Sequence, residues 1–409
     1  MSSPRRGVVI AGASVYNLRN VSDDSMFEPL YRALREGLEA DEPITLLCRH
    51  PEDRRIGDDR LEMVQNLDFP SKEASRGRRF HGFNTGDSVA HLHEAASRIR
   101  TARALIIGGD PFIEITLGAF RGLLPYVQML VTLARFEGTP VILFGVHLGR
   151  PPESEHGREI ARFILDNASL ITTREDSVVP TLREWTGNAA IVPGADAGFS
   201  TPAAPEPGIA AVLPPYAVAT IRSLYWTWRA PEREDFAARC AEVLDAEIAE
   251  QGMRVRLIPH CTYDNDHEWE DDRAMHRLIR AYSANAEWYD LVEHEPSVSE
   301  VIDAHTKASF VLSNRRHAGI FAALTETPFV IFGERSHLAP IHDILSEGPF
   351  LDYEQFFRPK GTRLLRAAIS TCRRHEERRT EIAREKALEQ RQKSDKALRA
   401  LVTFVREQD

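Results

Sequence analysis

Short apolar runs alternate with longer stretches of helical periodicity along the first half of the chain. The apolar runs are continuous, which is typical of parallel strands buried on both faces of a sheet. This order predicts a series of β-α-β units. We expect strands at 8–11, 44–47, 104–107, 141–144 and 169–172, and helices at 24–39, 86–101, 114–137, 154–167 and 176–186.

The same alternation restarts after a segment of proline and small residues at 198–208. That segment has no apolar periodicity and has the composition of a linker. We therefore predict an α/β protein of two doubly wound, Rossmann-like domains that face a cleft. The strands expected in the second domain are 217–221, 255–258, 310–312 and 329–332, and the helices are 232–251, 267–285, 298–306 and 317–325.

The last part of the chain, 361–409, is a charged helical pattern in which glutamates interleave with arginines. Mixed signs of charge at this spacing indicate a solvated helix face, and one long terminal helix could pack across both domains. The predicted organisation is an N-terminal domain over 1–197, the linker over 198–208, a second domain over 209–360 and this terminal helix.

Composition narrows the class of protein. A chain of 409 residues exceeds what one hydrophobic core supports, and its net charge of −10 disfavours nucleic acid as a partner. Its four cysteines lie far apart, as in a reduced cytoplasmic protein. No apolar run reaches the roughly 18 residues of a membrane span, and the N-terminal apolar stretch is too short for a signal peptide. We expect a cytoplasmic enzyme or binding protein, with homo-oligomer formation left open.

Glycines follow several predicted strands of the first domain: Gly12, Gly108, Gly109 and Gly145. In an open parallel sheet the ligand lies beyond the carboxyl ends of the strands, where glycine lets backbone approach it. Each glycine alone is also what an ordinary β-α turn uses. None completes a GxGxxG or phosphate-loop pattern, which disfavours a dinucleotide or nucleoside triphosphate.

Cationic side chains recur at the same strand ends. Arg174 follows one strand of the first domain, where its guanidinium suits either an anionic ligand or an ion pair with a neighbouring carboxylate. In the second domain, Arg222 ends the first strand and His260 the second. The most concentrated group is the segment 313–317, Ser-Asn-Arg-Arg-His, which precedes a helix of small residues.

Within that segment Arg315 and His317 are the strongest candidates. His317 can exchange protons near neutral pH, although a histidine there could also cap the helix or sit in the core. Arg316, which stands between them, is expected to face away. The acidic run 264–272 more often starts a helix in solvent than binds a metal, and Tyr225, Trp226 and Trp228 favour burial over stacking on sugars.

With these motifs the chain resembles the polysaccharide pyruvyltransferase family, whose members resemble two-domain glycosyltransferases of the GT-B type. The likeness runs from about residue 8 to 335. The chain departs from the family's sequence pattern at three places: Ser22 replaces a glycine, Asp110 follows the glycine pair, and Val146-His147 stands where Gln-Gly is common. The matching segments are 314–318 (R-x-H-A), 20–24 (N-x-G-D-E), 174–177 (R-D-E-x-S), the downstream 321–324 and 327–330, Gly108-Gly109, and Gly145 with Gly149 and Pro151.

The resemblance implies transfer of pyruvate from phosphoenolpyruvate to two hydroxyls of a sugar, with no metal and no organic cofactor. Phosphoenolpyruvate carries a carboxylate and a phosphate close together, so its site needs several cations. Arg315 and Arg174 are expected to clamp these groups from opposite domains. We expect Arg222, His260 and Asn314 to bind the donor, His317 to donate a proton, and Asp23 or Asp24 to remove one. The residues expected to make acceptor-side or backbone contacts are Asn20, Gly12, Gly108, Gly109 and Gly145.

Two other readings fit the same pattern. A GT-B glycosyltransferase would share the fold and could hold a nucleotide diphosphate in the cationic site, with Glu334 on a ribose hydroxyl. A non-catalytic binding protein on the same fold is suggested by the altered first turn at Ser22. Release of phosphate from phosphoenolpyruvate, or of nucleotide from a sugar nucleotide, separates the pyruvyltransferase from the glycosyltransferase. Alanine at Arg315 or His317 would leave the function of a non-catalytic binding protein unaffected.

Overall fold

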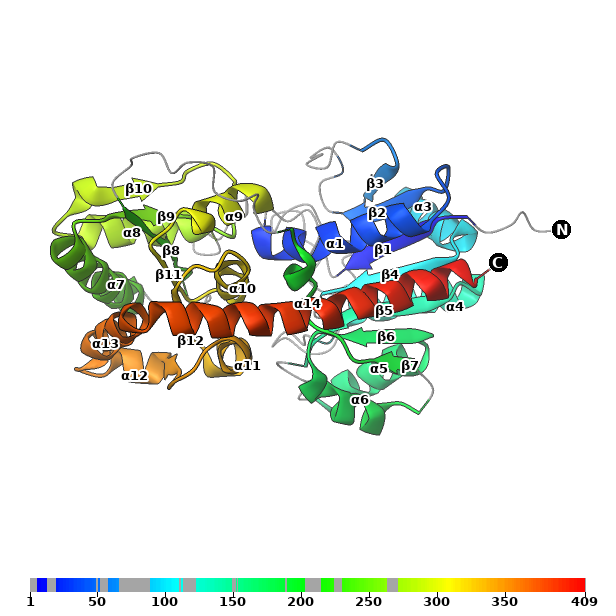
Figure 1. Ribbon diagram of the computed structural model, residues 1–409. Coiled ribbons are helices and arrows are strands. Elements are labelled where there is room, and N and C mark those ends of the chain that lie inside the picture. Colours follow the sequence, from blue (N-terminus) through cyan, green and yellow to red (C-terminus); the bar gives the residue numbers. More distant parts are fainter. Residues whose placement is uncertain are drawn as a thin grey trace. The chain divides into compact units, whose positions relative to one another are not determined.

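The computed structural model consists of two compact units, each built on one parallel sheet (Figure 1). Unit 1 comprises Met1–Leu18, Asp23–Ser200 and Gln390–Asp409, and unit 2 comprises Arg19–Ser22 and Thr201–Glu389. The residues described are 6–12, 20–48, 51, 58–65, 89–109, 112, 123–148, 152, 154–187, 190–202, 215–223, 230–262 and 271–408.

Unit 1 holds a seven-stranded parallel sheet of order β3-β2-β1-β4-β5-β6-β7. Its elements are β1 (Val8–Gly12), α1 (Val21–Gly37), β2 (Ile44–Cys48), β3 (Leu61–Gln65), α3 (Val89–Thr101), β4 (Ala104–Gly108), α4 (Leu123–Glu137), β5 (Val141–Val146), α5 (Glu155–Asp166), β6 (Leu170–Thr173), η1 (Asp176–Val178), α6 (Val179–Trp185), β7 (Ala190–Val192) and η2 (Ala197–Ser200).

Side chains of this sheet alternate between two hydrophobic layers. Val9 of β1 packs on the face covered by α3, α4 and α5, and Ile10 packs on the opposite face. That second face is covered by α1 and by the C-terminal part of α14 (Glu376–Arg406), the red helix of Figure 1. Leu401 of α14 is fully buried there, and Val402 lies so close to Gly37 that a Cβ at Gly37 would be 2.2 Å from its methyl group. Unit 1 is therefore doubly wound.

Unit 2 holds a six-stranded sheet of order β10-β9-β8-β11-β12-β13, and its paired strands are parallel. Its elements are β8 (Tyr216–Thr220), α7 (Ala230–Gln251), β9 (Arg254–Leu257), α8 (Asp272–Tyr282), η4 (Ala286–Trp288), β10 (Tyr289–Leu291), α9 (Val298–Thr306), β11 (Phe310–Ser313), α10 (Arg316–Leu324), β12 (Phe329–Gly333), α11 (Arg335–Leu345), β13 (Leu351–Asp352), α12 (Tyr353–Phe357), α13 (Gly361–Arg374) and the first part of α14.

Helices cover both faces of the second sheet as well. Phe332 of β12 packs into one layer with side chains of α7, α8, α12 and α13, Phe236 among them. On the other face Gly319 of α10 approaches β12 so closely that an added Cβ would stand 3.3 Å from Ile331. The predicted fold class, α/β with two doubly wound Rossmann-like sheets, is confirmed in both units.

Two details of the expected elements change. Four strands went unrecognised in the sequence, because β7, β10 and β13 have only two or three residues and β3 is half-buried and polar in the middle. The expected long C-terminal helix is present as α14, but it does not take up the whole charged segment, since α13 ends at Arg374 and α14 starts at Glu376, with His375 between them outside helical geometry.

Gly145 lies inside β5, not in the turn after it as the sequence indicated. It has a φ of +65°, and the pairing of β5 with β6 shifts register between Leu143 and Val146. Its N–H donates to the Thr172 hydroxyl over 2.9 Å. This bulge sets the direction of the chain into His147, the residue that follows the strand.

Gly145→Ala should lower the free energy of unfolding by about 1–2 kcal/mol, because an L side chain is strained at positive φ even where no atom blocks it. Gly187→Ala is the matched control: Gly187 also has open space around its missing Cβ, without a positive φ. Urea unfolding of both variants measures the difference. Equal stabilities would contradict the assignment of strain to this bulge.

Candidate functional site

The candidate site lies at the point where strand order reverses in unit 2, between β8 and β11. Doubly wound sheets bind ligands at the carboxyl ends of the strands beside such a reversal. Asn314 joins the two strand ends here, because its Oδ1 accepts from the Arg222 N–H over 2.8 Å and its Nδ2 donates to the Arg222 carbonyl over 2.9 Å. The same Nδ2 lies 2.8 Å from the Tyr353 hydroxyl.

Ser313 shapes the turn from β11 into α10. Its hydroxyl donates to the Thr220 carbonyl over 2.8 Å and accepts the Arg315 N–H over 2.8 Å. Arg315 is the extended N-cap residue of α10, and its side chain makes no cap to the helix. The guanidinium is therefore held at a helix N-terminus, which adds partial positive charge to the same place.

The buried carboxylate of Asp272 connects the strand ends of this site. Its carboxylate is 1% exposed, and one oxygen accepts the backbone N–H groups of His260 (2.9 Å) and Cys261 (3.0 Å). The other oxygen accepts from the Arg315 guanidinium, whose side chain is 11% exposed. One buried carboxylate thus links the end of β9, the start of α8 and the end of β11. The acidic run in which it stands was expected to be solvated, and for this residue that expectation is wrong.

The rings of His260, His305 and His317 surround the buried ring of Phe321. The His260 ring lies 5.7 Å from the Phe321 ring and 6.5 Å from the His305 ring, and His317 lies 6.1 Å from Phe321. Burial lowers the pKa of His260 well below its usual range, and the neighbouring histidines and Arg315 lower it further. Burial also lowers the pKa of His276 and of His305 to about 4. His260, His276 and His305 are therefore neutral at physiological pH.

The hydrogen bonds fix how the protons sit on two of these rings. His305 Nδ1 lies 2.7 Å from the Val301 carbonyl and must donate to it, which leaves a lone pair on Nε2. His276 Nε2 accepts the Ile221 N–H over 3.2 Å, which places its proton on Nδ1. In the described part of the chain neither ring nitrogen of His260 has a hydrogen-bond partner.

Sequence reasoning missed His276, His305, Asp272 and Tyr353 as members of this site. They stand on helices α8, α9 and α12 or at their starts, so a search of strand ends does not reach them. Arg316, expected to face away, is buried at 3% exposure in the first turn of α10; its orientation relative to a ligand stays a prediction.

In unit 1 the expected glycines stand at the carboxyl ends of two central strands. Gly12 and Gly108 are register partners at the ends of β1 and β4, and Gly109 follows with a φ of +81°. Asn20, assigned with unit 2, forms an isolated antiparallel bridge with Cys261, and its Oδ1 accepts the Ser22 N–H over 3.0 Å.

Asp23 and Asp24 stand in the first turn of α1, and Asp23 is buried. One turn later, burial and the charge of Asp24 raise the pKa of Glu28 to about 7. Sequence reasoning did not single out Glu28, because nothing in its spacing marks it. A carboxyl group half-protonated near neutrality can give or take a proton.

Arg174 forms a buried ion pair with Asp196, with Nε 3.6 Å from the carboxylate. Of the two expectations for Arg174, the ion pair is therefore present, and ligand binding stays a prediction, as does the clamp with Arg315. Glu175 stands at the N-cap position of η1, but its side chain makes no cap; its carboxylate contacts His147 Nδ1 instead.

Tyr225, Trp226 and Trp228, for which we expect burial, and residues 264–270, for which we expect a solvated helix start, lie outside the described residues. In the described ranges no group of three or more His, Cys, Asp or Glu side chains has an arrangement that would hold a metal ion. No helix of the described chain is long and apolar enough to cross a membrane.

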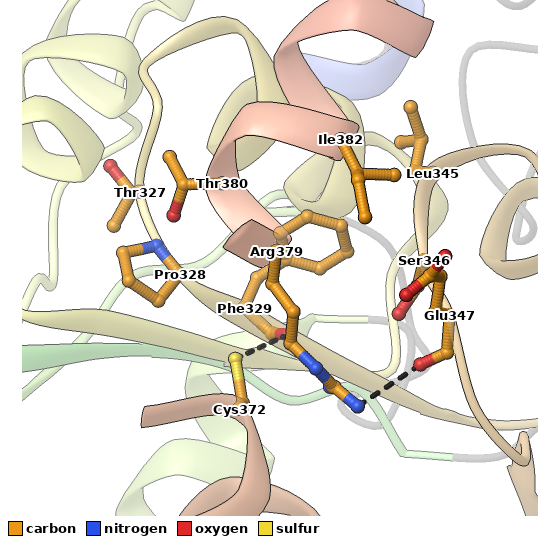
Figure 2. Close-up of a pocket in the computed structure, with 10 residues that line it drawn as sticks. All are labelled: Thr327, Pro328, Phe329, Leu345, Ser346, Glu347, Cys372, Arg379, Thr380 and Ile382. Atoms are coloured by element: carbon orange, nitrogen blue, oxygen red, sulfur yellow. Dashed lines mark hydrogen bonds between the residues drawn. The ribbon is translucent and has the colours of Figure 1, made fainter. Parts of the chain in front are cut away.

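A small cavity lies elsewhere in unit 2 (Figure 2). It is bordered by Thr327, Phe329 and Cys372, and Arg379 crosses it to donate to the Glu347 carbonyl over 3.1 Å. Its volume of about 10 Å³ suits a single water molecule. It stands at the amino end of β12, so it is not part of the strand-end site.

Comparison with known proteins identifies relatives. A model of the polysaccharide pyruvyl transferase family matches residues 23–336. No curated protein matches the chain. Similar solved structures are a putative UDP-N-acetylglucosamine 2-epimerase from Listeria monocytogenes (11% identity, TM-score 0.62, covering 99% of this chain and 98% of that one) and the UDP-GlcNAc 2-epimerase from Neisseria meningitidis bound to UDP-GlcNAc (9%, 0.58, 97% and 99%). At these identities the structures show a shared GT-B-like fold and no more.

Asp272→Ala should cost about 3–5 kcal/mol of stability, because it removes the buried carboxylate that accepts from Arg315 and from two backbone N–H groups. Asp290→Ala, which removes the partly exposed partner of Arg254, should cost less than about 1 kcal/mol. Denaturant unfolding of the two variants gives both numbers. A similar small loss of unfolding free energy in both variants would refute the role of Asp272 in connecting the strand ends.

Acid should destabilise the protein through the buried histidines. Their folded-state pKa lies below the value of 6.5 for an exposed histidine, so the unfolded chain binds more protons between pH 6.5 and about 4. The contribution of these histidines to the free energy of unfolding is fully present above pH 6.5. It falls as pH drops through this window, by about 3 kcal/mol for each such histidine. In His276→Gln the amide oxygen can still accept the Ile221 N–H, and the free energy of unfolding should decrease less steeply with falling pH than in the control His294→Gln, which changes an exposed histidine. Identical slopes in unfolding titrations would rule out the burial effect.

Proposed function

Because the chain belongs to the polysaccharide pyruvyl transferase family, it is a transferase enzyme, and we propose that phosphoenolpyruvate is its donor. The proposed reaction joins the pyruvyl carbon to two hydroxyls of a sugar or glycoconjugate as a cyclic ketal and releases phosphate. The observation that carries this proposal is the cationic strand-end site of unit 2, in which Arg315 is held by Asp272 at the start of α10.

The site has the properties that a small dianionic or trianionic donor needs. Arg315 supplies a planar guanidinium that matches a carboxylate or phosphate, and the free N–H groups of α10 point to the same strand ends. His260 is uncharged, and its ring N–H can donate a hydrogen bond to the anion, whereas His305 Nε2 carries a lone pair and can only accept from a protonated group. Burial of these groups strengthens each interaction, because little water screens it.

The proposed chemistry has three proton transfers, because the methylene carbon gains one proton and each of two hydroxyls loses one. In the net balance one hydroxyl proton restores the acid and the other leaves with the phosphate. The methylene carbon of phosphoenolpyruvate gains one proton, for which His317 is the proposed acid, and the adjacent carbon then bonds to the first hydroxyl oxygen. The second hydroxyl oxygen displaces phosphate from that carbon and closes the ketal. Each hydroxyl loses its proton, and Asp23 or Asp24 is a proposed acceptor of one.

The other expected residues keep supporting roles in this proposal. Arg222, His260 and Asn314 bind the donor, and Asn314 acts by fixing the Arg222 backbone. Arg174, Asn20, Gly12, Gly108, Gly109 and Gly145 are proposed to contact donor or acceptor from their own strand ends. We also propose that the reaction takes place in the cytoplasm, without a metal or an organic cofactor.

A glycosyltransferase that uses a sugar nucleotide is the competing proposal. The similar solved structures include an Anabaena protein in complex with UDP, and a cationic site could hold a diphosphate. The family match favours pyruvyl transfer, because the family model spans both the segment around Asp23 and the segment around Arg315. Mixing the protein with sugar nucleotides and an oligosaccharide panel, and measuring released nucleotide, tests this alternative directly.

Arg315→Ala and His317→Ala should each lower the rate of phosphate release from phosphoenolpyruvate by about 10²–10⁴-fold, because one removes the principal cation and the other the proton donor. Phosphate is measured with the same oligosaccharide panel. Arg335→Ala is the control, since Arg335 is an exposed arginine of the same unit paired with Asp352.

Arg335→Ala should retain the wild-type rate. Wild-type protein that neither gains thermal stability from phosphoenolpyruvate nor consumes it with any glycan would refute pyruvyl transfer. Full activity in both site variants would refute the site.

A further inference from the structure

Four ionisable side chains are buried together at the carboxyl ends of three neighbouring strands of unit 1. His147 follows β5, Arg174 and Glu175 follow β6, and Asp196 follows β7. Each of these residues is at most 6% exposed. The backbone ties the first two strand ends together, because the Arg174 N–H donates to the Val146 carbonyl over 2.9 Å.

The four groups form two pairs. Glu175 contacts His147 at Nδ1, and Asp196 faces Arg174 over 3.6 Å while its other oxygen accepts the Gly198 N–H over 2.9 Å.

The Glu175 contact also fixes the ring of His147. A carboxylate can only accept, so it holds the proton of a neutral imidazole on Nδ1 and leaves the lone pair on Nε2. In the described residues Nε2 has no hydrogen-bond partner, although the side chain is 6% exposed. A buried carboxylate that orients one histidine nitrogen while the other acts on a substrate is the geometry of a general base.

We propose that Glu175 and His147 form a catalytic dyad in which His147 Nε2 removes the proton from a hydroxyl of the acceptor sugar. This proposal rests on the proposed function. The hydroxyl O–H bond breaks, its electron pair forms the new bond from oxygen to the pyruvyl carbon, and the proton moves to Nε2 and later to solvent. Two acceptor hydroxyls lose protons in ketal formation, so His147 serves one of them and a base such as Asp23 or Asp24 can serve the other.

His147→Gln tests the dyad, since a glutamine amide still donates to Glu175 but cannot take a proton. Turnover with phosphoenolpyruvate and an oligosaccharide panel should fall at least 100-fold, while affinity for phosphoenolpyruvate alone stays within twofold. Wild-type turnover should decline as pH is lowered and His147 becomes protonated, and this acid limb should be absent from the residual activity of His147→Gln. His156→Gln, on α5 with a side chain 52% exposed, is the control and should behave as wild type.

Glu175→Gln gives a second test that retains the histidine. Without the carboxylate, a proton on His147 is less favourable, so the acid limb should move to lower pH and turnover should fall about 10–100-fold. A merely structural pair would lower thermal stability and leave the position of the limb unchanged. An active wild type with fully active His147→Gln, or an unmoved limb in Glu175→Gln, would overturn the dyad alone. A wild type that consumes no phosphoenolpyruvate would overturn the proposed function and the dyad with it.

Discussion

A buried carboxylate holds the site of unit 2 in shape. Asp272 is the first residue of α8, and it accepts two N–H groups from the end of β9 while it pairs with Arg315 at the end of β11. Removing an ion pair from water costs several kcal/mol per ion, so such a pair is stable only when further hydrogen bonds satisfy the carboxylate. The backbone at His260 and Cys261 supplies them, and the position of Arg315 therefore depends on three elements at once.

The neutral histidines follow from the same constraint. A fixed guanidinium in a buried place disfavours further positive charge, and burial alone already removes it from His260, His276 and His305. Arg315 is therefore flanked by the polar but uncharged rings of His260 and His276. Such an environment can bind an anion strongly and still distinguish it by hydrogen bonds, which is what the proposed donor requires.

Much of the fold could be read from the sequence, because buried parallel strands are continuous apolar runs. β8, β11 and β12 were recognised for this reason, and β9 was recognised although arginines alternate with Val255 and Leu257 in it, whereas β10 and β13 are too short to form a recognisable run. The candidate residues Arg222, His260, Asn314, Arg315 and His317 were accessible in the same way, as residues that follow strands. Contacts between distant elements were not accessible: Asp272 stands in an acidic run that resembles a solvated helix start, and the partner of Arg174 lies 22 positions away at Asp196. Only the folded chain brings those charges together.

The central claim is that Arg315 binds phosphoenolpyruvate at the strand ends of unit 2, beside His317. A crystal structure of the protein soaked with phosphoenolpyruvate tests it most directly. The account predicts electron density for the ligand with its carboxylate or phosphate within hydrogen-bond distance of the Arg315 guanidinium, and its methylene carbon facing the His317 ring. Ligand density at another place, with the Arg315 and Asp272 pair untouched by it, would contradict the account.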